Sequence, residues 1–219
     1  MKNLIRVSAA VIALFTPTLA FAHHPLGGLP MATFADGLLS GIGHPLLGFD
    51  HLFFVALVGI AALFTAQRFT TPAAYIAAML IGCYAMSSGI GLPAKEIIIG
   101  VSLLALGAVV LSGRALSVLP AIAIFAGFGL FHGSAFGDSI ASQEAAVGGQ
   151  VLMGYLIGLS FVQYAIALGA GWFVSNVLGA LNAQAIQARL AGAIVAGVGL
   201  FLTLENVEGI VFDLMGWAT

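Results

Sequence analysis

Two histidines and an aspartate lie close together in a stretch of the chain that is otherwise apolar. His44, Asp50 and His51 are followed directly by apolar side chains from Leu52 to Leu57. Ionisable side chains are costly inside a membrane and usually mark a functional site there. Neutral imidazole with carboxylate suits borderline divalent metals such as nickel, cobalt, copper and zinc, whereas calcium and magnesium prefer oxygen ligands. We therefore expect a transition-metal site inside a membrane-spanning segment.

The spacing of these residues does not form a compact site on a straight α-helix. His44 and His51 would share one face about 10 Å apart along the axis, and Asp50 would point about 100° away from His51. Because Pro45 disfavours helical geometry at the residue before it, a helix could begin there with His44 at its edge. We therefore expect the first helix to be broken near His44-Pro45. An unbroken helix would instead make His44 and His51 parts of successive sites, so both arrangements stay open.

The composition of the chain indicates a polytopic membrane protein of the all-α class. Hydrophobic residues make up 61% of the 219 residues and charged residues 6%, against about 25% charged residues in globular proteins. The 29 glycines suit the close approach of membrane helices. The pattern of a nucleotide-binding P-loop is absent. We expect the lipid bilayer as a partner, and neither a nucleotide nor a nucleic acid.

The N-terminal segment has the pattern of a secretory signal peptide. Two basic residues precede a short apolar core, and Ala20-Phe21-Ala22 fits the rule for the cleavage site. We expect residues 1–22 to be removed and residues 23–219 to form one six-helix transmembrane domain; an uncleaved first span is the alternative. Cleavage would place His23 and His24 at the new N-terminus. There they could capture a metal outside the membrane, unless they belong to a flexible leader and are incidental.

Six membrane spans follow from a length of about 20 apolar residues per span. We expect them at 33–66, 72–90, 96–112, 116–135, 149–173 and 189–207. In this arrangement Arg68, Arg114 and Arg189 lie on one side of the membrane, and the acidic residues gather on the other side with Lys95. The positive-inside rule makes the arginine side cytoplasmic and places both termini of the mature chain outside.

His132, in the fourth expected span, is a candidate ligand from a second helix. Gly129, Gly133 and Gly137 recur around it at every fourth residue. Such a glycine face lets a neighbouring helix approach closely, which brings His132 near that neighbour. A single histidine at such a position is more often a hydrogen-bonded packing residue. The first motif favours a ligand, because a transition metal usually takes ligands from more than one element.

A weak internal repeat relates the two histidine motifs. Asp50 follows His44 by six residues, and Asp138 follows His132 by six residues. Three expected spans separate the two copies, and an odd number reverses their orientation. This arrangement could be a three-plus-three inverted repeat of the kind found in many secondary transporters.

The two motifs together resemble the HupE/UreJ family of nickel/cobalt permeases. The motifs are His44-Pro45-x-x-Gly48-x-Asp50-His51 and Phe131-His132-Gly133-x-Ala135-x-Gly137. The resemblance covers nearly the whole mature chain and implies secondary uptake of Ni²⁺ or Co²⁺ across the bacterial inner membrane. It implies that the metal is contacted by His44, Asp50, His51 and His132. Asp138 stands where members of the family commonly have glutamate, and it is a further candidate.

Two other functions fit the same residues. A membrane-embedded zinc hydrolase would use the histidines and Asp50 to hold a zinc ion that activates water, although the helical His-Glu-x-x-His pattern with its general base is absent. A membrane metal sensor or chaperone would bind metal without flux. We favour the permease, and hence expect neither an enzyme nor a prosthetic group, with Ni²⁺ or Co²⁺ as the transported substrate. A homo-oligomer is left open.

Overall fold

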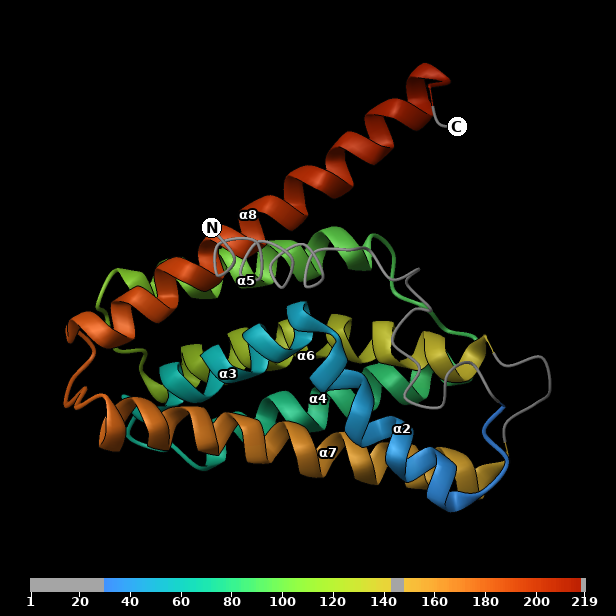
Figure 1. Ribbon diagram of the computed structural model, residues 1–219, viewed down its shortest axis with the longest axis horizontal. Coiled ribbons are helices and arrows are strands. Elements are labelled where there is room, and N and C mark those ends of the chain that lie inside the picture. The colour runs from blue at the N-terminus through green and yellow to red at the C-terminus, as the bar shows by residue number, and fades with distance from the viewer. Residues whose placement is uncertain (1–29, 143–147, 218–219) are drawn as a thin grey trace, which may run out of the picture.

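The computed structural model describes residues 30–142 and 148–217, and these residues form a bundle of helices without a strand (Figure 1). The helices are α2 (Phe34–Leu47), α3 (Phe49–Leu63), α4 (Thr70–Ser87), α5 (Lys95–Leu111), α6 (Val118–Ala141), α7 (Gly149–Trp172), the π-helical turn η1 (Phe173–Val177) and α8 (Ile186–Met215). The predicted all-α fold is confirmed. The predicted signal peptide, His23 and His24 lie outside the described residues.

The six expected spans coincide with helices, but not all of these helices have the length and composition of a membrane span. Among the described residues, α6, α7 with η1, and α8 are long and apolar enough to cross a membrane, and the bent pair α2 and α3 could supply a fourth span. Helices α4 and α5 have 18 and 17 residues. The count of six spans and the inverted repeat therefore stay predictions.

Two helices continue beyond the expected ends at residues 135 and 207. Helix α6 runs on to Ala141 because Asp138 pairs with Lys95 at the start of α5 and does not interrupt the helix. Helix α8 runs on to Met215 with its acidic side chains on the exposed surface. It ends where Gly216 takes the left-handed conformation, with a φ of 69°, that suits a glycine after a helix.

The expected break in the first helix exists, but its position near His44-Pro45 was wrong. The chain bends by 82° between α2 and α3 at Gly48, whereas Pro45 lies inside the last turn of α2. Pro45 removes only the one backbone bond to the Gly41 carbonyl, and the Gly48 N–H still donates to the His44 carbonyl, so the helix continues past it. A Cβ at Gly48 would lie only 3.0 Å from the His51 ring, so the bend packs the backbone against that side chain. It also places Asp50 in the first turn of α3, where a helix favours negative charge.

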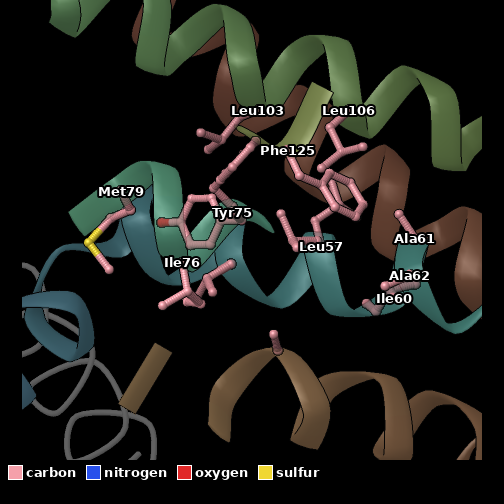
Figure 2. Close-up of a cluster of buried hydrophobic side chains, with 14 of the residues drawn as sticks. Leu57, Ile60, Ala61, Ala62, Tyr75, Ile76, Met79, Leu103, Leu106 and Phe125 are labelled. Atoms are coloured by element: carbon pink, nitrogen blue, oxygen red, sulfur yellow. The ribbon is translucent and has the colours of Figure 1, made fainter. Parts of the chain in front are cut away.

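Three pairs of helices pack with their backbones almost in contact, and these pairs position the polar side chains. Helix α2 packs on α7, α4 on α6 and α5 on α8. A Cβ at Gly158 of α7 would collide with the Leu38 carbonyl of α2, and one at Gly133 of α6 with the Met79 carbonyl of α4. Helix α3 crosses the middle of the bundle, and its buried apolar side chains meet those of α4, α5 and α6 (Figure 2).

The two ends of the bundle differ in charge. The connections between α3 and α4, α5 and α6, and α7 and α8 lie together at one end (Figure 1), and Arg189 Nε donates there to the Leu111 carbonyl at 2.9 Å. We call this the arginine end, because Arg68 and Arg114 lie in two of these connections. The opposite end, with Asp36 and the Lys95–Asp138 ion pair, is the acidic end.

Candidate metal centre

His51 of α3 and His132 of α6 lie in direct contact inside the bundle. Their Nδ1 atoms are 2.8 Å apart and their ring centroids 5.0 Å apart. The residue His51 is 6% exposed, and His132 is fully buried. The packing therefore brings together two motifs that are separated in the chain by the helices α4 and α5.

The hydrogen bonds around His132 are consistent with one set of proton positions on the two histidines. Ser102 Oγ of α5 donates to the Ile99 carbonyl at 2.6 Å, so the hydroxyl oxygen is left to accept from His132 Nε2–H at 2.9 Å. His132 Nδ1 then has a lone pair, and His51 donates its Nδ1–H to it. His51 consequently carries its lone pair on Nε2, and neutral imidazole with such a lone pair is the metal-binding form.

His44 has the same arrangement of protons by a different route. Its Nδ1 lies 2.9 Å from the Tyr155 hydroxyl and 3.0 Å from the Ser139 hydroxyl. Tyr155 donates its own hydrogen to the Phe136 carbonyl at 3.0 Å, so it accepts from His44 Nδ1–H. With Tyr155 as the acceptor, His44 carries its proton on Nδ1 and its lone pair on Nε2. Contacts of this type through the second ring nitrogen hold metal-binding histidines in a fixed orientation.

His44, His51 and Asp50 are neighbours, but they do not form a closed coordination shell. The ring centroids of His44 and His51 are 6.1 Å apart, and Asp50 Oδ2 lies 3.7 Å from His51 Nε2. Two imidazoles bound to one metal at about 2.1 Å have centroids roughly 5–6 Å apart, so a shared ion needs only small rotations. Within residues 30–142 and 148–217, no three His, Cys, Asp or Glu side chains form a group that could hold a metal as they stand.

Asp138, the further predicted ligand, is not part of the histidine group. It lies at the acidic end, where its carboxylate pairs with the ammonium group of Lys95, and its side chain is 41% exposed. A cation that reached this carboxylate would compete with Lys95 for it. The role of Asp138 as a ligand stays a prediction.

Several hydroxyl groups of the centre were missed by the sequence reasoning. Ser102 lies in the expected span 96–112, which has no ionisable residue in its interior, and nothing in the sequence singles it out. Tyr155 belongs to neither motif, and Ser139 follows the second motif without belonging to it. A polar residue in an apolar helix is a weak signal by itself, because it can bond to the backbone of its own helix, as Ser160 does to the Leu156 carbonyl.

Comparison with known proteins places the two motifs in a family. A family model described as HupE / UreJ protein matches residues 11–202, which include both motifs. The chain belongs to the HupE/UreJ family. It is also 28% identical over 198 residues to Protein HupE of Rhizobium leguminosarum bv. viciae, with 85% of this chain and 98% of that protein covered. No solved structure matches the chain.

The resemblance inferred from the histidine motifs is thus confirmed. Membership of the HupE/UreJ family supports a metal transporter in general terms. The helices that are long and apolar enough to cross a membrane agree with a protein that contacts the lipid bilayer.

Proposed function

We propose that this member of the HupE/UreJ family is a permease that takes up Ni²⁺ or Co²⁺ across the bacterial inner membrane. The observation that carries the proposal is the buried contact between His51 and His132, which leaves the His51 Nε2 lone pair beside the Asp50 carboxylate. Nitrogen and carboxylate donors of this kind suit borderline divalent metals. The burial of the two histidines among apolar helices fits a cation that passes through the membrane.

In the proposed site the cation is bound by His44 Nε2, His51 Nε2 and the Asp50 carboxylate, and His132 orients His51. The 6.1 Å between the rings of His44 and His51 supports one shared ion over two successive sites. His132 can enter the shell only after the proton between the two Nδ1 atoms has left. Two nitrogen atoms on one metal lie about 3.0–3.4 Å apart, somewhat further than the 2.8 Å between these atoms.

The membrane potential, an ion gradient or a partner protein would have to drive this uptake. A divalent cation that crosses the membrane inward gains about 4.6 kcal/mol per 100 mV, twice the value for a single charge. In the proposed orientation the acidic end faces outward and gathers cations, and the arginine end faces the cytoplasm. In this proposal the transported ion is the substrate, and the protein neither catalyses a reaction nor binds a prosthetic group.

Proteoliposomes test the proposal directly. The purified protein is expected to take up radioactive Ni²⁺ or Co²⁺ in preference to Zn²⁺ at matched free concentrations. The variants His44→Ala, His51→Ala and Asp50→Asn should lose uptake while they remain folded, because each removes one proposed ligand. Asp213→Asn, which changes an exposed carboxylate on α8, should retain it.

The same measurement separates the permease from its two rivals. A zinc hydrolase would hold zinc tightly in stoichiometric amount without flux, and a sensor or chaperone would bind metal without flux. Normal uptake by both histidine variants, or no uptake by the unaltered protein, would refute the proposed site.

A further inference from the structure

A second buried polar pair connects α4 and α7. The Tyr75 hydroxyl donates to Gln163 Oε1 at 2.6 Å, and both side chains are fully buried. Gln163 Nε2 is buried as well and has no hydrogen-bond partner among the described residues. A buried polar group without a partner costs free energy, so its presence in an apolar interior requires an explanation.

The pair adjoins the histidines. The Phe54 ring stacks on the His132 ring with centroids 4.3 Å apart, and the Tyr75 ring lies 5.6 Å from Phe54 and 6.2 Å from His132. Tyr75 packs beside Gly129 of α6, which precedes His132 by about one turn in the direction of the arginine end. Tyr75 is therefore the next polar side chain beyond His132 on this side of the bundle.

Helix α7 shows the same order of groups. Tyr155, the partner of His44, is followed about 12 Å further along the helix by Gln163. One turn beyond Gln163, Ala167 lines a pocket of about 300 Å³ at the arginine end, together with Arg68 and Asn176. The Tyr75–Gln163 pair thus lies between the histidines and a pocket at the arginine end.

The other described neighbours of Tyr75 are mostly apolar, apart from the thioether of Met79. Figure 2 shows Tyr75 among buried apolar side chains of α3, α4, α5 and α6. The side chains drawn around it include Leu57, Ile76, Leu103, Leu106 and Phe125. A dehydrated ion that left the histidines in this direction would find no oxygen or nitrogen ligand among these side chains other than those of Tyr75 and Gln163.

We propose that Tyr75 and Gln163 form a second cation-binding station between the histidine site and the pocket at the arginine end. This inference rests on the proposed metal uptake. Rotation of the Gln163 amide by 180° keeps its bond to Tyr75, because a phenol hydroxyl can accept from Nε2 as well as donate to Oε1. The amide oxygen then becomes the group without a protein partner. The rotated amide oxygen binds the cation together with the phenol oxygen of Tyr75. In the unrotated amide, Nε2–H occupies that position and repels the cation.

Two nearly volume-conserving substitutions test this station. Tyr75→Phe and Gln163→Met each remove one polar group, and the double variant leaves an apolar pair. Initial uptake of radioactive Ni²⁺ by proteoliposomes should fall at least tenfold in all three variants. The affinity of the purified protein for Ni²⁺, measured by titration calorimetry, should stay within about twofold of the unaltered protein, because the histidine site is intact. Tyr84→Phe, which removes an exposed hydroxyl from the same helix, is the matched control and should transport normally.

Thermal unfolding separates this role from a purely structural one. Replacing both partners of a buried hydrogen bond by apolar groups can be nearly neutral, so the double variant should regain stability lost in the single variants. If it regains uptake as well, the pair is only structural and the station is refuted. Unchanged uptake in Gln163→Met, or loss of nickel affinity together with uptake, also refutes a separate station.

The two proposals fail in different ways. If the unaltered protein takes up no metal, the proposed function is wrong, and the proposed station is refuted as well. If the unaltered protein takes up Ni²⁺ and all three variants do so equally well, only the station is wrong.

Discussion

At the scale of single residues, hydroxyl groups contact the histidine nitrogen atoms that the proposed site does not use for the metal. Ser102 accepts from His132 Nε2–H, and His132 Nδ1 in turn accepts from His51. Without Ser102, His132 could carry its proton on Nδ1 and donate it to His51. The proton of His51 would then sit on Nε2, the atom that the proposed site uses for the cation.

Replacement of Ser102 by alanine should therefore weaken the binding of Ni²⁺ by about 10–100-fold, the usual effect of losing a group that orients a metal ligand. Titration calorimetry on the purified protein measures this affinity. Ser112→Ala is the matched control. Like Ser102, Ser112 donates its hydroxyl hydrogen to a carbonyl three residues earlier on α5, but no histidine hydrogen bond to its hydroxyl is found among the described residues. Equal affinities in the two variants would show that Ser102 does not set the proton positions.

At the scale of the elements, close pairs of helices hold the histidine-bearing segments in register. Helices α2 and α7 meet through Gly37 and Gly41 on one side and Gly154 and Gly158 on the other. This contact places His44 against Tyr155. Small residues let membrane helices approach in this way, and a larger side chain at such a contact must push the helices apart.

Gly158→Ala should consequently lower the free energy of unfolding by about 1–3 kcal/mol, the usual cost of overpacking. A Cβ there would meet the backbone of α2, which cannot move aside as a flexible side chain can. Gly169→Ala on the same helix should be neutral or slightly stabilising, because nothing lies within 4 Å of a Cβ at that position. Unfolding in detergent, followed by circular dichroism, compares the two. A destabilisation of the same size at Gly169 would contradict the helix-contact argument.

At the scale of the whole molecule, the bundle separates the arginine-containing connections from the acidic end. The proposed direction of transport follows from this separation, because connections rich in arginine stay in the cytoplasm. The histidine centre, the Tyr75–Gln163 pair and the 300 Å³ pocket then follow one another from the outside toward the inside.

Labelling of single cysteines with a membrane-impermeant maleimide tests this orientation. In a Cys83→Ala background, which removes the buried native thiol, Ser88→Cys lies in an exposed turn at the acidic end and Ala115→Cys in an exposed connection at the arginine end. Ser88→Cys should be labelled in intact cells, and Ala115→Cys only after the membrane is opened. The reverse pattern would invert the proposed direction of transport.

The sequence by itself determined the helical class, the approximate positions of the helices and the family. Apolar composition and span length are local properties, so each expected span coincides with one helix or with the pair α2 and α3. The motifs around His44 and His132 likewise needed no structure, and the family match over residues 11–202 confirms the resemblance that they indicated.

The tertiary structure decided how those motifs meet. Three features depend on contacts between helices. They are the bend at Gly48 instead of Pro45, the hydrogen bond between His132 and Ser102, and the ion pair between Asp138 and Lys95. Such contacts join residues that are distant in the chain, and no local pattern of residue types records them. Composition and periodicity can therefore place a histidine on a helix, but only the packed bundle determines which nitrogen of its ring is left to bind a metal.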